Sequence, residues 1–348
     1  MNLYTILPVN PLEYKTEILK LWERNHSDIA PLLPKRFTWI YENNPYGTPK
    51  CWLLKHNKTN KFIGAASLIP RRMYVNGKPM MAGIAADMMI DKKHRTLGPA
   101  LILERAVIDC CKKGEFDFIY GFSPPAAYTA QIKAGFKFIG NAIRMVRPLK
   151  TASVIEKQKG KTIATLFFPL LDTTLQIIDN FTFITKSFFK PNFSCCILDH
   201  FDERFDNLWH KAPKNGLIIG ERTASYLNWR YMKSPYHKHK TFILQDKKEK
   251  ILGYIIYSLI DNKALIYDIY AENQYSILLL NFIKLMRKRG ICSISFTLIE
   301  NNPLVKHLKF SFFLKREEPL KIIIFSSNRN LTQSFLNWYL VAGDKDTE

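Results

Sequence analysis

The stretch KKHRTLGPALIL, residues Lys92–Leu103, joins two apolar segments of the chain. The run before it, 84–90, predicts a strand, and the pattern from Pro99 to Lys113 predicts a helix with one charged stripe. Gly98 and Ala100 leave little side-chain bulk where that helix starts. The first N–H groups of a helix have no intrahelical acceptor and lie at the positive end of its dipole, so this junction could bind a phosphate. Taken alone, the stretch is more typical of a basic loop with an ordinary tight turn.

Landmarks of the first part of the chain recur further on. The pattern W-x-Y-x-x-x-P-Y begins at Trp39 and again at Trp229, 190 positions later, and Asp87 is matched by Asp268. The simplest interpretation is two copies of one domain. We predict a first domain over 1–150, a linker with an apolar or amphipathic helix over 151–195, a degenerate second domain over 196–330, and a C-terminal helix or tail over 331–348.

The predicted element order of the first copy is a helix, antiparallel strands with an Asn76-Gly77 hairpin, the strand–loop–helix unit, a strand, a helix and a strand. This order resembles the GNAT acyltransferase superfamily in its tandem form. The family signature [QR]-x-x-G-x-[GA] is matched by 95–100, and a second family motif, N-P-x-A-x-x-x-Y-x-x-x-G-F, is matched in part by 124–136. The resemblance implies an α/β fold (α+β mixed sheet) of two tandem GNAT-like domains, each a mostly antiparallel twisted sheet flanked by helices.

The resemblance also implies a co-substrate, acetyl-CoA or a longer acyl-CoA, whose pyrophosphate lies against the loop. The cofactor-binding residues carried over from the family pattern are Ile90, Arg95, Thr96, Leu97, Gly98, Pro99 and Ala100. Pro99 departs from an ideal site because it removes one N–H group from the helix start.

Two residues are candidates for catalysis, since the family reaction is attack by an amine on a thioester. Asp87 lies on the strand before the loop and is a candidate base; the alternative is a structural carboxylate that pairs with Arg71 or Arg72. The family's acid tyrosine is replaced by Gln131. Tyr128, one helical turn earlier, is the candidate acid, and its alternative role is packing.

The second copy departs from the family pattern. It has no glycine or basic cluster at the turn after Asp268, and Ser311-Phe312 stands where the motif has Gly-Phe. His307 falls near the acid position, but a surface or packing role is favoured. Trp39, Tyr41 and Tyr46 recur in this copy, which favours a core role over an acceptor pocket. We expect the second copy to shape the acceptor cleft.

Composition limits the partners and the compartment. The formal charge is +21, from 51 basic and 30 acidic residues, which favours an anionic partner or reflects lysine use in an AT-rich genome. Six cysteines without C-x-x-C spacing predict reduced thiols, a cytoplasmic protein and no metal site. The N-terminus lacks the pattern of a signal peptide. The apolar stretch 162–189 contains Asp172 and Asp179, so we expect an amphipathic helix that docks on the protein or lies on the inner face of the membrane.

Three functions remain open at this point. The first is an enzyme that moves an acyl group from acyl-CoA, or from an acyl carrier protein, to an amine on a small molecule or on a lipid- or sugar-linked acceptor. The second is a Fem-type transferase that uses aminoacyl-tRNA; outside this alternative we expect no nucleic-acid partner. The third is a non-catalytic tandem scaffold that binds an anionic ligand.

Overall fold

The computed structural model describes residues 3–150, 193–328 and 337–346, together with Thr173, Ile177 and Leu331. The first half contains β1 (Tyr4–Val9), α1 (Lys15–Asn25), α2 (Leu33–Phe37), η2 (Thr38–Glu42), β2 (Lys50–His56), β3 (Lys61–Val75), β4 (Lys78–Ile90), α3 (Leu97–Lys112), β5 (Phe118–Ser123), α4 (Pro125–Ala134) and β6 (Lys137–Pro148). The second half contains β7 (Phe193–Leu198), α7 (Glu203–Lys211), β8 (Leu217–Gly220), α8 (Ala224–Leu227), η4 (Asn228–Met232), β9 (Lys240–Asp246), β10 (Ile251–Ile260), β11 (Lys263–Ala271), α9 (Tyr275–Lys288), β12 (Ser293–Ile299), α10 (Leu304–Phe310) and β13 (Leu314–Phe325).

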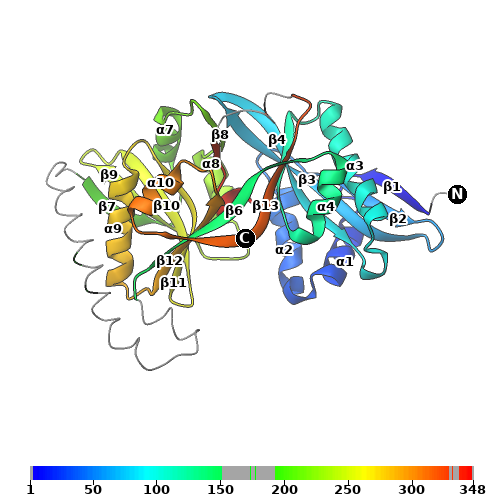
Figure 1. The fold of residues 1–348 in the computed structure, drawn as a ribbon, viewed down its shortest axis with the longest axis horizontal. Coiled ribbons are helices and arrows are strands. Elements are labelled where there is room, and N and C mark those ends of the chain that lie inside the picture. The colour runs from blue at the N-terminus through cyan, green and yellow to red at the C-terminus, as the bar shows by residue number, and fades with distance from the viewer. Residues whose placement is uncertain are drawn as a thin grey trace.

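The two halves have the same order of elements, except that β8 has no strand counterpart in the first half, and they lie side by side (Figure 1). Both contain a π-helical turn, η2 and η4, which carries the repeated W-x-Y segment. The predicted hairpin is present: Val75 pairs with Lys78, and the turn residues Asn76 and Gly77 have positive φ values of 51° and 80°. The predicted linker and its amphipathic helix fall almost entirely outside the described residues, and β7 begins inside the range predicted as linker.

The described strands form one mixed, mostly antiparallel sheet in the order β1-β2-β3-β4-β5-β13-β6-β12-β11-β10-β9-β7. The two halves exchange their last strands. Strand β13 of the second half lies between β5 and β6, and β6 of the first half pairs with β12. Figure 1 shows β6 and β13 crossing between the halves. The sheet is therefore continuous, and the predicted fold class is confirmed.

Apolar side chains pack on both faces of the sheet. In the first half, α3 covers one face, where Leu103, Val107 and Ile108 pack against residues of β2 and β3. Helix α1 covers the other face through Ile18 and Trp22, and this second cluster of buried residues continues into the second half. The halves thus share a core.

The central strands β4 and β11 are bulged at equivalent positions. The β3–β4 register shifts between Ala65 and Ser67, and Asp87 adopts a φ of 52° at this bulge. The parallel pairing of β4 with β5 ends at Ile84, although β4 continues to Ile90. Strand β11 likewise stops pairing with β12 at Ile266. Each half therefore has a place where its central strand separates from the next strand.

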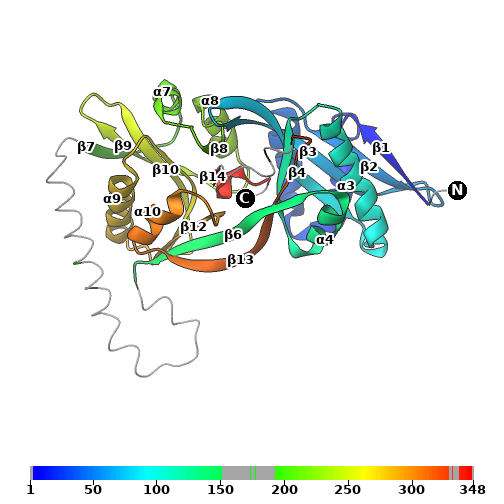
Figure 2. The same ribbon diagram turned by 45° about the horizontal axis from the view of Figure 1, so that its top comes forward.

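Residues 337–346 of the predicted C-terminal helix or tail form a strand and a short 3₁₀ helix that pack against the rest of the protein. Residues 337–346 form β14 (Asn337–Tyr339), which pairs with β8, followed by the short 3₁₀ helix η5 (Ala342–Asp344). Trp338, Tyr339, Leu340 and Val341 are buried. Figure 2 shows this segment between the two halves. No helix of the described residues combines the length and apolarity needed to cross a membrane.

Candidate functional site

The start of α3 is open to a ligand. The helix begins at Leu97, two residues before the predicted start, so Pro99 is its third residue and its ring is buried. Thr96, just before the helix, donates its N–H to the His94 carbonyl oxygen at 2.8 Å. The amides of Leu97 and Gly98 are in the first turn, where N–H groups have no intrahelical acceptor. Apart from its chain neighbours and the backbone of its own helix, no described atom lies within 4 Å of the position that a Cβ of Gly98 would take. A phosphate can therefore approach this backbone directly.

Of the basic residues before the helix, some hold the loop in place by hydrogen bonds and others are exposed. The Arg95 guanidinium donates to the Ile90 carbonyl oxygen at 2.8 Å and to Asn25 at 2.9 Å, so this side chain fixes the loop to the end of β4. His94 is held against β1 by the Tyr4 hydroxyl at 3.1 Å. Lys92 and Lys93 are exposed and lie beside the helix start. Positive potential for an anion therefore comes from these lysines and the helix dipole.

The other predicted cofactor residues surround this start. Ile90 is buried at the end of β4, Leu97 is 40% exposed, and Ala100 is partly buried in the first turn of α3. All of them follow the point where β4 and β5 separate. A ligand held at Gly98 by its phosphate can extend from there along the edge of β4.

The Asp87 carboxylate is fully engaged. Arg36 approaches one of its oxygens at 2.8 Å, and the Tyr41 hydroxyl donates to the other at 2.7 Å. Tyr41 also contacts the Ser67 hydroxyl at 2.6 Å. The ion pair is buried, with 3% of the Arg36 side chain and 7% of the Asp87 side chain exposed. Asp87 therefore forms an ion pair, as expected for a structural carboxylate, but its partner is Arg36 and not Arg71 or Arg72.

The C-terminal segment brings a second carboxyl group to this cluster. Asp346 is partly buried, and burial together with the nearby Asp87 carboxylate raises the pKa of Asp346 above its ordinary value. Asp346 and Lys345 line a small cavity with Arg71, Tyr226 and other residues from both halves. No sequence pattern predicts this contact, because Asp346 lies 259 positions from Asp87 in the chain.

Helix α4 carries Tyr128, the candidate acid that protonates the thiolate, and Gln131. Tyr128 is partly buried, and the Lys321 ammonium of β13 lies 4.1 Å from the centre of its ring. Gln131, which replaces the family tyrosine, is 5% exposed and faces α3. The exchanged strand therefore places a cation from the second half beside Tyr128, which no local pattern could indicate.

The corresponding space in the second half is filled by the chain itself. Val341 forms a bridge with Leu298 of β12, and the Leu340 carbonyl oxygen accepts the N–H of Ile299 at 3.1 Å. The Tyr339 hydroxyl donates to the Ile269 carbonyl oxygen of β11. These contacts lie where β11 and β12 separate, so the C-terminal segment takes the place that stays open in the first half.

Buried charges fix this segment to both halves. Asp344 contacts Arg71 of β3 at 2.6 Å and Arg222 at 3.0 Å, and Arg222 pairs with Asp268 at 2.9 Å. All four side chains are at most 2% exposed. Asp268 is therefore structural. His307 stacks on Tyr275 at the start of α9, which agrees with a packing role.

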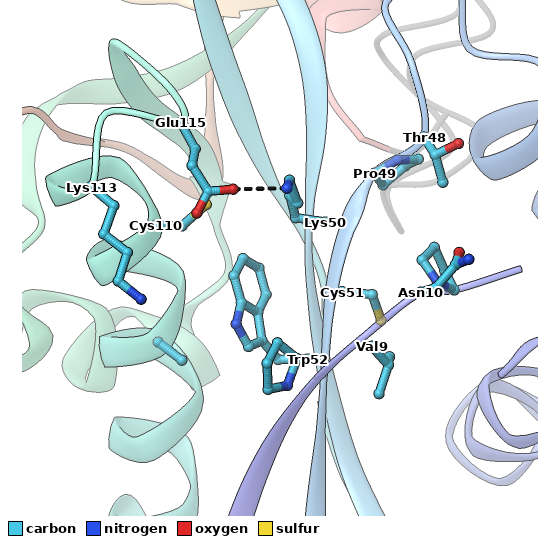
Figure 3. Close-up of a pocket in the computed structure, with 13 residues that line it drawn as sticks. Val9, Asn10, Thr48, Pro49, Lys50, Cys51, Trp52, Cys110, Lys113 and Glu115 are labelled. Atoms are coloured by element: carbon cyan, nitrogen blue, oxygen red, sulfur yellow. Dashed lines mark ion pairs between the residues drawn. The ribbon is translucent and has the colours of Figure 1, made fainter. Parts of the chain in front are cut away.

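A cavity of about 590 Å³ lies at the other end of α3 (Figure 3). Lys50 of β2 and Glu115 form an ion pair at 2.8 Å across it. Burial and the adjacent Glu115 raise the pKa of the Cys110 thiol to about 12, so this thiol is no nucleophile. The cavity lining includes Ala106 and Cys110 of α3, which lie about 12 Å and about 18 Å along the helix from Gly98. Within the described ranges, no three His, Cys, Asp or Glu side chains are grouped to hold a metal ion.

No family model and no curated protein sequence matches the chain. Solved structures do match. A probable N-acyltransferase of unknown function from Enterococcus faecalis has a TM-score of 0.64 at 10% identity, over 93% of this chain and 72% of that chain. A tandem GNAT protein from the clavulanic acid biosynthesis pathway has a TM-score of 0.52 at 10% identity, over 93% and 99%. Saccharomyces cerevisiae N-myristoyltransferase with bound myristoyl-CoA has a TM-score of 0.53 at 12% identity, over 94% and 80%. With its bulged central strands, the separation of β4 from β5 and the repeated order of elements, the chain has the fold of the GNAT superfamily in its tandem form.

Proposed function

We propose that the protein is an N-acyltransferase that transfers an acyl group from acyl-CoA to an amine. The observation that carries this proposal is the open backbone at Gly98, at the start of a 16-residue helix and beside the end of a bulged strand. The amides of Leu97 and Gly98 bind the pyrophosphate, and Lys92 and Lys93 add positive potential. The similar solved structures include acyltransferases, which supports the same class of reaction.

The reaction needs two proton transfers, which we assign to different residues. The amine nitrogen attacks the thioester carbonyl carbon, the C–S bond breaks, the amine loses a proton and the thiolate gains one. Asp346 accepts the amine proton, because its raised pKa makes its carboxylate a stronger base. Tyr128 donates to the thiolate. Asp87 holds Tyr41 and Arg36 in place by a hydrogen bond and an ion pair. The second half closes the acceptor side of the cluster.

The net charge of the chain bears on the choice of acceptor. The charge of +21 favours an acceptor or donor with anionic groups, such as a lipid- or sugar-linked amine or an acyl carrier protein. The same charge would support peripheral contact with an anionic membrane from the cytoplasmic side.

The direct experiment is thiol release from acetyl-CoA and from longer acyl-CoAs over a panel of amines. Amine-dependent release supports the proposal. Loss of most turnover in Asp346→Asn with unchanged acetyl-CoA affinity supports the assigned base, and Asp199→Asn, an exposed carboxylate elsewhere, is the matched control. Acyl-CoA binding without turnover would support the scaffold alternative. Salt-sensitive tRNA binding without acyl-CoA binding would support the aminoacyl-tRNA alternative.

A further inference from the structure

Glu104 is a carboxyl group buried between two helices. It lies on α3 and is 2% exposed, and it faces Gln131 of α4, which is 5% exposed. The part of the chain that the structure describes offers Glu104 no cation, and Gln131 is the one side chain that hydrogen-bonds to it. An ionised carboxylate in this position would be costly, because nothing there compensates its charge.

The hydrogen bonding of the pair is incomplete if Glu104 is ionised. Gln131 donates from its amide nitrogen to the Glu104 carboxyl group. Oε1 of Glu104 and Oε1 of Gln131 nevertheless have no donor among the described residues. A buried acceptor without a donor destabilises the folded state. A proton on Glu104 removes both deficits at once, since its O–H then donates to Gln131 Oε1 and closes a ring of two hydrogen bonds.

The surroundings favour the protonated form. The apolar cluster between α3 and the sheet contains aliphatic and aromatic side chains, and its titratable members are the thiols of Cys110 and Cys111 and the phenols of Tyr4 and Tyr128. Burial raises the pKa of Glu104 from 4.5 to about 7, against the opposing effect of the Gln131 hydrogen bond. Glu104 therefore exchanges its proton with solvent near neutral pH, where an ordinary glutamate is fully ionised.

The pair also connects the two helices that flank the proposed acyl-CoA site. Helix α3 begins with the Gly98 turn, and α4 carries Tyr128. We propose that Glu104 and Gln131 form a carboxylic acid–amide pair that joins α3 to α4, and that loss of the Glu104 proton to solvent loosens this helix pair and weakens acyl-CoA binding. Glu104 is thus a positioning residue. Only the effect on binding rests on the proposed function; the proton itself does not.

The first test follows the carboxyl carbons of the full-length protein, labelled with ¹³C at glutamate, by NMR from about pH 5 to about pH 9. One glutamate should titrate near neutrality in the wild type. That signal should be missing in Glu104→Gln, which keeps the ring through two amides, and present in Glu23→Gln, which removes an exposed glutamate of α1. If every glutamate of the wild type titrates below about pH 5, the pair is ionised and the inference is wrong.

The second test measures the dissociation constant of acetyl-CoA over the same pH range. The constant should rise several-fold between about pH 6 and about pH 8 in the wild type and in Glu23→Gln, and stay level in Glu104→Gln. Equal pH dependence in the wild type and Glu104→Gln would overturn the link between the proton and binding. Absence of acetyl-CoA binding at every pH would overturn that link together with the proposed function, while the NMR titration still decides whether the acid–amide pair exists.

Discussion

Trp39 and Trp229 each donate the indole N–H to the backbone carbonyl oxygen of the other, at 2.8 Å in both directions. The two residues are equivalent positions of the repeat and lie on the equivalent π-helical turns η2 and η4. Their rings are 5.6 Å apart, and both side chains are buried. The repeated W-x-Y segments therefore hold the halves together, and the exchange of β6 and β13 completes the connection on the sheet.

The first prediction concerns this reciprocal contact. Trp39→Phe and Trp229→Phe should each lower the free energy of unfolding by about 2 kcal/mol, because each leaves a buried carbonyl oxygen without its donor. The double variant should lose less than the sum, since both changes break one contact. Urea unfolding gives the values. Trp52→Phe is the control for loss of indole volume within the first half, and an equal loss in that variant would show that the cross-half hydrogen bonds contribute nothing specific.

The second prediction concerns the buried charges around Asp344. Asp344→Ala should destabilise the protein by about 3–5 kcal/mol, because Arg71 and Arg222 would lose a buried counter-ion. Lys345→Gln, a change of charge at the adjacent and less buried position, should have a small effect. Urea midpoints of the two variants decide the matter, and similar midpoints would mean that Asp344 does not hold the C-terminal segment in place.

The third prediction is a pH dependence of stability caused by Glu104. The folded pKa of about 7 lies above the ordinary value of 4.5, so the folded protein binds this proton more tightly than the unfolded chain. The stabilisation by protonated Glu104 is therefore complete at low pH. As the pH rises from about 4.5 to about 7, its contribution to the free energy of unfolding falls by about 3 kcal/mol in total. The difference in unfolding free energy between Glu104→Gln and wild type should grow with pH over this range. A difference that is independent of pH would contradict the shift.

The fourth prediction is the stoichiometry of acyl-CoA. One molecule should bind per chain, because Val341 and Leu340 occupy the space between β11 and β12 that would serve a second one. Calorimetry with a quantified protein stock measures this number. Two equivalents in the wild type, or one residual equivalent in Gly98→Glu, would show that the second half also binds the co-substrate.

Much of the fold follows from local sequence patterns. Alternating and helical apolar patterns and the Asn76-Gly77 turn depend on neighbouring residues, and the structure has the corresponding elements. The repeat is visible because each copy of its short W-x-Y pattern is itself a local feature of the sequence. The loop at Gly98 is also local, and its backbone is open as the sequence suggested. The helix start at Leu97 differs from the predicted Pro99 because helix ends depend on backbone geometry that residue types define only loosely.

The rest depends on contacts between distant segments. The exchange of β6 and β13, the position of Asp346 and the pairing of Asp87 with Arg36 all join parts of the chain that no short pattern relates. The expected correspondence between the end of α10 and the end of α4 was also wrong by one residue. Phe312, with a φ of 59°, and buried Phe313 correspond to Gly135 and Phe136, whereas we expected Ser311-Phe312. An aromatic residue in a left-handed conformation is uncommon, so a glycine pattern does not find it.

The central claim is that the amides at Gly98 bind the diphosphate of coenzyme A. Calorimetry with acetyl-CoA on wild type, Gly98→Glu and Lys58→Gln tests it most directly. A Cβ at 98 would have no atom of another part of the protein within 4 Å, so Gly98→Glu should fold normally and place a carboxylate where the phosphate would lie. Lys58→Gln makes the same change in net charge on the exposed β2–β3 turn. We predict equal affinity for wild type and Lys58→Gln and no measurable binding to Gly98→Glu at about 1 mM. Binding to Gly98→Glu with wild-type affinity, or no binding to the wild type at that concentration, would contradict the account.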